Sequence, residues 1–319
     1  MLFDDIKSMI RKVTSEGPQD PGSSELTAGV RDYASKKCTT ISIANQKGGV
    51  GKTTTCINLA SGLAKRNFQV LIIDLDPQSH ASLGIDVDVY NFSTSIYDVF
   101  VKRVDLEDVI VPTYLKNLEI APATSLLTGA QLEISDLLGR EGILKTSIWR
   151  MLNTHAKHYD YILIDSSPSL NLLTINGLVA SQSVLIPMQP HYFSLEGMSQ
   201  LFSTLKIVKE RINSDLEILG ILPTIFDPRT KMSRDMLAQL KDYFEEKLLK
   251  TVIRMNTKLV EAPAHGKSIF DYDAHCNGAK DYWDLTEEII GLTKPQFSMK
   301  TNHATVVQNG ETTNLEAPE

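Results

Sequence analysis

The apolar positions of this chain fall into two kinds of segment that alternate along its length. Residues 39–44 are β-branched and apolar, which is typical of a buried strand, and residues 53–65 carry apolar side chains at helical spacing. The same criteria predict further strands over 69–75, 118–121, 161–165, 183–187 and 216–223. They predict further helices over 143–155, 170–180, 195–212, 233–249 and 279–292. This alternation favours an α/β fold, with a mostly parallel sheet and helices on both faces.

The segments at the two ends of this alternation have a different pattern. Residues 1–13 place their apolar side chains on one helical stripe, which predicts a short amphipathic helix. Residues 14–38 include a stretch rich in Gly, Pro and Ser and are predicted to form a flexible linker, whereas 295–319 are polar without period and are predicted to be a disordered tail. The N-terminal helix could bind a partner, lie on a membrane surface or pack on the parent domain. The predicted α/β domain therefore spans 39–294.

Composition narrows the class of protein. A hydrophobic share of 42% in 319 residues is ample for a core, and the chain contains no run of about 18 apolar residues that could span a membrane. The first residues lack the basic start and apolar stretch of a signal peptide. Three cysteines without a C-x-x-C pair indicate reduced thiols rather than a zinc site or an iron–sulfur cluster. We therefore expect a cytoplasmic protein. Its net charge of −7 argues against DNA binding by the whole surface, although a local basic patch remains compatible with it.

A glycine-rich loop joins the first predicted strand to the first predicted helix. It reads Lys47-Gly48-Gly49-Val50-Gly51-Lys52-Thr53-Thr54. The final Gly-Lys-Thr fits a phosphate-binding P-loop, but Asn45 stands where the first glycine belongs, and Lys47 is an additional cation. The glycines let successive N–H groups point at an anion, Lys52 can reach the β- and γ-phosphates, and Thr53 can bind Mg²⁺. One lysine is sufficient for this chemistry, so Lys47 requires a separate explanation.

Two further predicted strands deliver acidic residues to the same edge of the sheet. One ends in the sequence containing Asp74 and Asp76, and the other ends at Asp165. Ligands of open α/β sheets bind at the carboxyl ends of the strands, beside the P-loop. Asp76 could orient an attacking water, contribute to the Mg²⁺ shell or simply cap the next helix, whereas Asp165 has the position of a Walker B acid that holds Mg²⁺.

These motifs together resemble the ParA/MinD family of deviant-Walker ATPases, which are P-loop NTPases of the SIMIBI class. The resemblance rests on residues 47–54, 74–78, 165–170, 190–197, 222–230 and 261–279, and the last of these fits the ParA (Soj-like) branch. It implies ATP and Mg²⁺ as cofactors, and a catalytic role for Lys47, Lys52 and Asp76. It further implies that Lys47 crosses to the phosphates of a second subunit, so that ATP binding produces a homodimer. The adenine-side loop of the family corresponds to residues 224–227, which include Thr224, Phe226 and Asp227.

The resemblance also implies function. Soj-like proteins bind DNA nonspecifically as ATP dimers, and a ParB-like or other stimulating protein triggers slow hydrolysis that resets the cycle. We therefore expect a nucleoid-associated ATPase that partitions or positions a chromosome locus, a plasmid or a protein cargo. Residues 229–280 contain ten Lys or Arg and seven Asp or Glu, a local excess of three positive charges in an acidic chain. The candidate DNA-binding residues are Arg229, Lys231, Arg234, Arg254, Lys258 and Lys267.

Other readings remain open. The chain could be a MinD-like spatial regulator that acts through a membrane or protein scaffold by means of its N-terminal helix. It could also be a metabolic enzyme of the same fold, although the cysteine spacing does not suit a nitrogenase-type reductase. The polar tail lacks an amphipathic stripe, so we expect no C-terminal membrane anchor. Three departures from the family pattern stand out: a single proline after Asp165, His191 in place of an acid, and no basic residue over 274–277.

Overall fold

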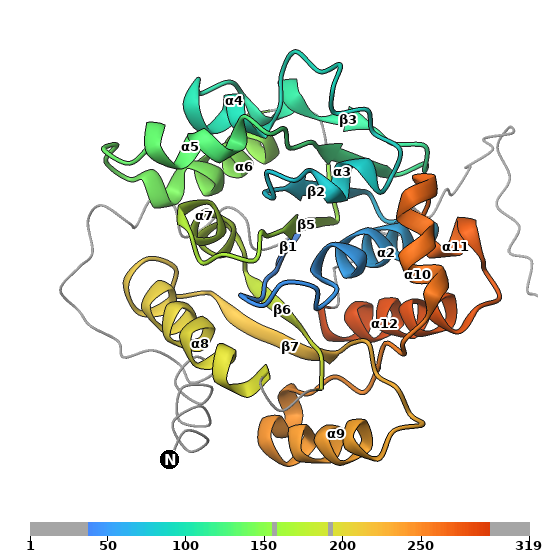
Figure 1. The fold of residues 1–319 in the computed structure, drawn as a ribbon. Helices are drawn as coiled ribbons and strands as arrows, with labels where there is room; N and C mark the ends of the chain where they lie inside the picture. The colour runs from blue at the N-terminus through green and yellow to red at the C-terminus, as the bar shows by residue number, and fades with distance from the viewer. Residues whose placement is uncertain (1–37, 155–157, 191–193, 294–319) are drawn as a thin grey trace, which may run out of the picture.

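The computed structural model describes residues 38–154, 158–190 and 194–293. The predicted N-terminal helix, the predicted linker up to residue 37 and the predicted tail lie outside these residues. Within them the chain forms a seven-stranded sheet with the order β3-β4-β2-β5-β1-β6-β7 (Figure 1). The strands are β1 Thr39–Ile43, β2 Val70–Asp74, β3 Val111–Pro112, β4 Leu118–Ala121, β5 Tyr161–Asp165, β6 Ser183–Met188 and β7 Glu217–Pro223. Every predicted strand is therefore present, and the α/β fold is confirmed.

The sheet is parallel except at one edge. β1 lies between β5 and β6, and β2 lies between β4 and β5, all in parallel register. β3 pairs with β4 in antiparallel register over only two residues, Val111 and Pro112. The sequence analysis did not predict this edge strand, because two residues carry no periodic signal and Pro112 cannot donate to a ladder.

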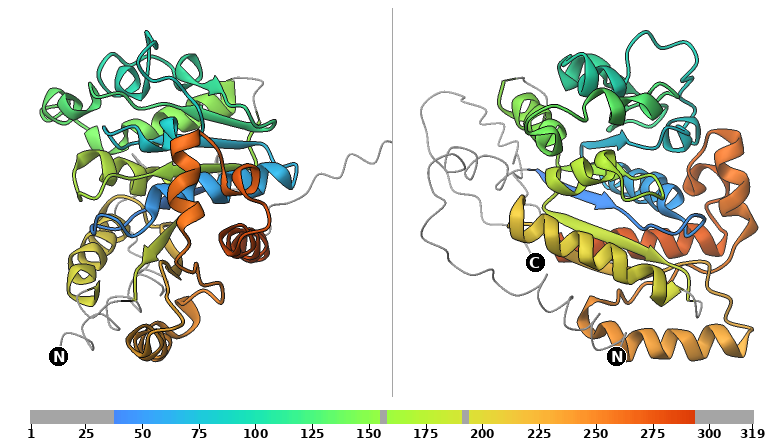
Figure 2. Two further views of the ribbon diagram at one scale, coloured as in Figure 1. Left: turned by 45° about the vertical axis from the view of Figure 1, so that its right-hand side comes forward. Right: turned by 60° about the vertical axis from the view of Figure 1, so that its left-hand side comes forward.

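Helices cover both faces of the sheet (Figure 2). The longer ones are α2 Lys52–Lys65, α6 Ile143–Thr154, α7 Leu172–Ala180, α8 Ser194–Arg211, α9 Lys231–Phe244 and α12 Asn277–Thr293. The shorter ones are α3 His80–Leu83, α4 Ile96–Val101, α5 Leu127–Glu133, α10 Thr257–Glu261 and α11 Ile269–Tyr272. Four 3₁₀ turns are described as well: η1 Leu106–Val109, η2 Arg140–Gly142, η3 Glu245–Lys247 and η4 Ala262–His265. None of the helices in the described ranges is long and apolar enough to cross a membrane.

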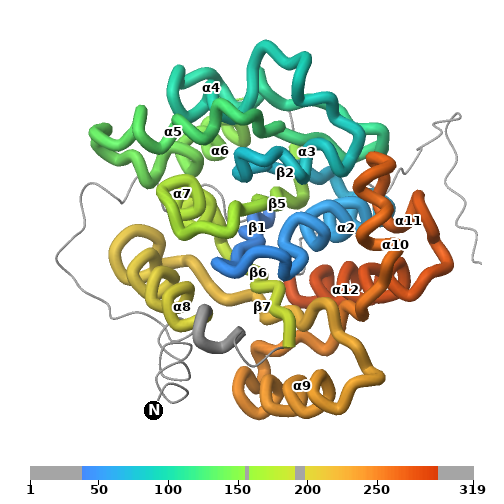
Figure 3. The backbone as a smooth tube through the Cα atoms, viewed as in Figure 1, coloured from blue at the N-terminus to red at the C-terminus, as the bar shows by residue number. Residues whose placement is uncertain are grey.

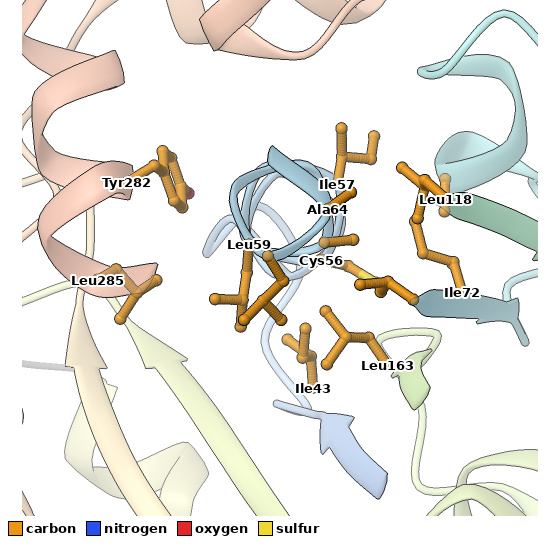
Figure 4. Close-up of a cluster of buried hydrophobic side chains, with 14 of the residues drawn as sticks. Ile43, Cys56, Ile57, Leu59, Ala64, Ile72, Leu118, Leu163, Tyr282 and Leu285 are labelled. Atoms are coloured by element: carbon orange, nitrogen blue, oxygen red, sulfur yellow. The ribbon is translucent and has the colours of Figure 1, made fainter. Parts of the chain in front are cut away.

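Helix α2 lies at the centre of the core on one face of the sheet. Figure 4 shows its apolar side chains between those of the strands and those of α12. Ile43 and Leu163 are both fully buried beneath it, and Tyr282 and Leu285 of α12 close its other side. The Tyr282 hydroxyl also forms a hydrogen bond with Thr55 Oγ1 at 3.1 Å. The first turns of α2 are therefore fixed both to the sheet and to α12.

Helix α9 ends five residues earlier than the periodicity predicts. Its apolar stripe, Met236, Leu240 and Phe244, packs beside β7 and α8 at the edge of the sheet. After Phe244 the chain takes a left-handed conformation at Glu245, with a φ of 48°, and continues as η3. Leu249 then donates its N–H to Ile221 of β7 at 2.9 Å. Leu248 and Leu249, the apolar residues of the predicted stretch 245–249, therefore return to the sheet and do not extend the helix.

The three cysteines differ in exposure. Cys38 and Cys56 are buried, and burial raises the pKa of the Cys38 thiol to about 12. Cys276 is half-buried just before α12, where its Sγ accepts a hydrogen bond from Ala279 N at 3.4 Å. All three are free thiols, as the sequence analysis predicts.

Candidate functional site

The P-loop runs from the end of β1 into the start of α2 at the middle of the molecule (Figure 3). Gly49 and Gly51 have φ values of 71° and 84°, which non-glycine residues rarely adopt. No atom lies within 4 Å of a Cβ placed at either position, so there is room for a side chain. Glycine is therefore required here by the backbone conformation and not by steric crowding. Gly51 directly precedes α2, so the loop presents the N-terminus of that helix to a ligand.

Asn45, which replaces the first glycine of the usual motif, holds the entrance of the loop. Its Nδ2 donates to Pro187 O of β6 at 2.7 Å, and its Oδ1 accepts from Lys47 N at 2.9 Å. This residue therefore joins the loop to the neighbouring strand. In the sequence Asn45 stands out only as a departure from the pattern, and only its position between a strand and the glycines indicates its role.

The two lysines of the loop have different surroundings. Lys52 is buried, and its Nζ donates to Lys47 O at 3.1 Å. Burial lowers the pKa of Lys52, while the charges of Asp165 and Asp76 act in the opposite direction. Lys47 is exposed, and within the described part of the chain its ammonium forms no ion pair. Lys52 is therefore directed at its own loop, whereas Lys47 is available to a group outside this subunit.

Three carboxylates gather at the ends of β2 and β5. Asp74 and Asp165 are opposite each other in the register of these adjacent strands. Asp74 Oδ2 accepts hydrogen bonds from Ser82 N and Ser82 Oγ at 3.0 and 2.7 Å, and burial raises the Asp74 pKa to about 6. Asp76 Oδ1 accepts from Gln78 N at 2.9 Å, so it stabilises the turn after β2. Asp74 therefore supports the loop, and Asp76, two residues beyond β2, is buried as well, with 7% of its surface exposed.

Asp165 has the surroundings expected of a residue that binds a cation. Its side chain is fully buried, and neither carboxylate oxygen has a hydrogen-bond donor among the described residues. Burial and then the charge of Asp74 raise its pKa, while the nearby Thr53 hydroxyl and the Lys52 ammonium lower it. A buried carboxylate without a partner is costly, and a divalent cation would remove that cost.

Mg²⁺ fits this group of residues. It prefers oxygen ligands and usually keeps several waters, with one or two protein groups and substrate phosphates completing its shell. Thr53 and Asp165 supply such protein oxygens. Across the described ranges, no three His, Cys, Asp or Glu side chains are arranged to hold a metal unaided. Participation of Asp76 in the shell stays a prediction.

A cavity of about 680 Å³ opens beside the P-loop. Its polar end is formed by Gly49, Gly51, Thr53 and Thr54, and its other walls come from the ends of β7, α3, α10 and η4. Much of this wall is apolar, which is typical of pockets that enclose part of an organic ligand. The P-loop residues therefore lie at one end of a space suited to a molecule that is larger than phosphate.

The predicted adenine-side loop meets the cavity only in part. Thr224 lines it, and its Oγ1 donates to Val50 O at 2.8 Å, so this residue ties β7 to the P-loop. Ile225 also lines it, with a left-handed φ of 54° that is unusual for a β-branched residue. Phe226 and Asp227 are not among the lining residues: Phe226 pairs through its backbone with Arg254. The use of these two residues by a nucleotide stays a prediction.

The six candidate DNA-binding residues lie on different elements. Arg229, Lys231 and Arg234 lie together at the start of α9, and all three are exposed. Arg229 pairs with Asp227 at 2.9 Å, which holds the pKa of that carboxyl at about 2, yet its side chain remains 82% exposed. Among the six candidates, these three residues at the start of α9 are therefore the ones that form a local cluster.

The other three candidates have different environments. Lys258 pairs with Glu261 at 2.8 Å, and Lys267 is exposed in the turn after η4. Arg254 is held by Asp281 and lines the cavity. Among the departures from the family pattern, Ser167 bonds to Ser169 through their hydroxyls at 3.0 Å, whereas His191 lies outside the described residues.

Comparison with known proteins gives matches over most of the chain. A family model described as an AAA domain matches residues 38–218. The sporulation initiation inhibitor protein Soj of Bacillus subtilis is 45% identical over 78% of this chain and 97% of its own length. The chromosome partitioning protein ParA of Myxococcus xanthus is 40% identical over 80% of this chain and 89% of its own length.

Solved structures of nucleotide-bound proteins are also similar to this chain. Cobyrinic acid a,c-diamide synthase from Mycobacterium smegmatis, with bound ADP and magnesium, has a TM-score of 0.68 and 30% identity over 78% of this chain and 93% of its own. A putative plasmid partition protein from Borrelia burgdorferi, bound to AMPPNP, has a TM-score of 0.65 and 27% identity over 82% of this chain and 100% of its own. Both the sequence and the architecture therefore match proteins built around a nucleotide-binding P-loop.

Proposed function

Because the chain belongs to the ParA/MinD family of deviant-Walker ATPases, in its Soj-like branch, we propose that it is an ATP-switched partitioning or positioning ATPase. ATP and Mg²⁺ bind at the P-loop, two subunits associate, and the dimer binds nucleoid DNA nonspecifically. A ParB-like or other partner stimulates slow hydrolysis, which returns the protein to the free state. The cargo is a chromosome locus, a plasmid or a protein assembly.

The observation that carries this proposal is the contrast between the two lysines of the loop. Lys52 is buried and donates to the loop that would surround a phosphate, so it serves the nucleotide of its own subunit. Lys47 is exposed at the front of that loop. A second cation presented outward beside a phosphate site suits a γ-phosphate bound by another copy of the chain. The triphosphate then favours the dimer by differential binding, as any nucleotide switch requires.

The remaining residues have separate tasks in the proposed reaction. The P-loop N–H groups and Lys52 hold the phosphates in place, and Asp76, whose charge acts on Lys52, orients the attacking water. Asp165 and Thr53 would hold Mg²⁺, which supplies charge neutralisation to the phosphate oxygens when it is bound. The reaction breaks the bond between the γ-phosphorus and the β–γ bridging oxygen of ATP, which leaves with ADP, and water supplies the new oxygen of the released phosphate.

DNA co-sedimentation in the presence of ATP or ADP tests the switch. The wild-type protein should bind DNA with ATP and lose most of that binding with ADP. Lys47→Ala should bind DNA weakly in both states, because the dimer lacks its contact between subunits. Asp76→Ala should still bind DNA in the presence of ATP. It should hydrolyse ATP at least about 100-fold more slowly than the wild type, since the attacking water is no longer oriented.

A matched control is Lys116→Ala, which removes an exposed lysine from the turn before β4. This variant should behave as the wild type does. DNA binding of equal strength with ATP and with ADP would contradict the switch, and a Lys47→Ala protein that dimerises normally on ATP would contradict the role of Lys47.

A further inference from the structure

An ion pair forms part of the wall of the cavity, away from the P-loop. Arg254 is one of the residues that line the cavity, and its side chain is held by Asp281 of α12, which is only 5% exposed. Arg254 Nε lies 3.1 and 3.0 Å from the two carboxylate oxygens, and Nη2 lies 2.5 Å from Oδ1. The Arg254 backbone N–H also donates to Oδ2 at 2.9 Å. Such a forked pair fixes the plane of the guanidinium.

The element that carries Asp281 is itself fixed. The next residue, Tyr282, also lines the cavity and bonds to Thr55 of α2 through its hydroxyl. On the other side, Phe226 and Arg254 form an isolated β-bridge that joins this segment to the end of β7. The position of the Arg254 guanidinium is therefore determined by α12, α2 and β7 together.

This arrangement leaves hydrogen-bond donors unused. A guanidinium has five N–H groups, and the pair with Asp281 engages those of Nε and one of Nη2. Among the described residues, Nη1 has no acceptor, and the Arg254 side chain is 34% exposed. Arg254 is also the one Lys or Arg among the residues that line this cavity.

We propose that Arg254 binds the nucleoside part of the nucleotide, either by donating to its acceptor atoms or by stacking on the base, and that Asp281 is its positioning residue. This inference rests on the proposed function, since the P-loop must hold the phosphates. With the phosphates at Gly49, Gly51 and Thr53, the nucleoside extends into the remaining cavity, which Arg254, Thr224 and Ile225 help to line. A planar guanidinium both donates hydrogen bonds and stacks on aromatic rings.

The surroundings of Arg254 favour this role over contact with DNA. The carboxylate of Asp281 neutralises its charge, so it contributes little to the attraction of a phosphate backbone. Arg254 also lines a concave and largely apolar space, where each polar group has a strong influence on the orientation of a ligand. In the sequence Arg254 is one of the DNA-binding candidates, because charge alone does not reveal its partner.

The test measures the affinity of the full chain for three probes in the presence of Mg²⁺: ATP, ADP and inorganic triphosphate. Arg254→Met alone would leave Asp281 buried and unpaired, which is strongly destabilising. The informative variant is therefore the double change Arg254→Met with Asp281→Asn, and its melting temperature without nucleotide should be close to that of the wild type. Lys250→Met, which removes an exposed lysine from the same segment, is the control.

The double variant should bind ATP and ADP about tenfold or more weakly, by similar factors, and should bind triphosphate as the wild type does. The proposal is overturned if ATP and ADP affinities are unchanged, or if triphosphate binding falls by the same factor, because the damage would then be general. A wild-type protein that binds none of the three probes would instead contradict the proposed function. This outcome is measured on the wild-type protein alone and is therefore distinct from the outcomes that overturn the role of Arg254.

Discussion

At the scale of single residues, the site is defined by charges that lie close together without full compensation. Asp165 is buried with neither oxygen bonded among the described residues, and Asp74 faces it from the adjacent strand. A carboxyl whose pKa is higher in the folded state binds its proton more tightly there than in the unfolded chain. Its contribution to stability is therefore full at low pH and declines as the pH rises through the interval between the two pKa values.

Asp165→Asn should consequently stabilise the nucleotide-free protein in Mg²⁺-free buffer. We expect a gain of roughly 1–2 kcal/mol in the free energy of unfolding at pH 7.5, because a buried charge is removed. The gain should be smaller at pH 5, where the wild-type carboxyl, with its raised pKa, is protonated to a greater extent. Urea denaturation at the two pH values measures this difference.

The control for this measurement is Asp235→Asn, which changes an exposed carboxylate on α9 and should have little effect at either pH. An identical gain for Asp165→Asn at both pH values would show that the ionised form of Asp165 is not the destabilising species.

Motif spacing predicts the phosphate-binding residues well, because their roles depend on neighbours in the sequence. Lys52 and Thr53 follow the glycines directly, and Asp165 ends a strand that its own apolar run identifies. The roles of Asn45 and Arg254 could not be predicted in the same way. Their partners, Pro187 and Asp281, are distant in the sequence and become neighbours only in the folded chain.

At the scale of elements, the end of β7 is joined to the P-loop by one side chain. Thr224→Val keeps the shape of the side chain and removes the hydrogen bond to Val50 O, which would leave that carbonyl without this partner. We expect a loss of about 1 kcal/mol in unfolding free energy and a several-fold weaker affinity for ADP. Thermal denaturation and fluorescence titration with a labelled ADP measure the two effects.

Thr230→Val is the matched control. It removes a hydroxyl that caps α9 at Ser233 N, so it should cost a similar amount of stability without change in ADP affinity. Equal ADP affinities in the two variants would contradict a role for Thr224 in holding the loop.

The helices and strands are predictable from the sequence where a strand is buried in the centre of the sheet or where a helix packs one apolar face on it. The buried strands β1, β2 and β5 and the helix α2 follow such patterns, and each was predicted within a few residues. The helices α3, α10 and α11 have four or five residues each, too few for a helical period to show. Their positions depend on tertiary bonds, such as the one from Ile269 N to Asn58 Oδ1 at 2.7 Å.

At the scale of the whole molecule, charge is unevenly distributed around an acidic average. The chain carries −7 in total, while Arg229, Lys231 and Arg234 form an exposed basic group where α9 begins, beyond the β7 edge of the sheet (Figure 1). Nonspecific DNA binding through such a group depends on the release of counterions, so its affinity falls with salt.

Replacement of these three residues by alanine should weaken DNA binding in the ATP state and make it less dependent on salt. The slope of log K against log salt concentration should decrease by about 1 to 3, according to how many of the residues contact phosphates. Binding isotherms at three or more salt concentrations provide the slope. ATP affinity should be unchanged, because these side chains are not part of the cavity wall.

A double alanine variant of Lys102 and Lys116, near the opposite edge of the sheet, provides the control. It should leave the salt slope as it is in the wild type. A slope that decreases equally in both variants would indicate a response to net charge and would contradict a DNA-binding face at α9.

The unequal exposure of the three cysteines gives the molecule a natural attachment point for a reporter. Cys38 and Cys56 are inside the core, so a thiol-reactive fluorophore should modify Cys276 selectively in the native protein. That position directly precedes α12, the helix that carries both Asp281 and Tyr282 to the cavity. A dye at Cys276 would therefore stand on the element that contacts the nucleotide cavity, and nucleotide exchange could be followed in real time without any engineered cysteine.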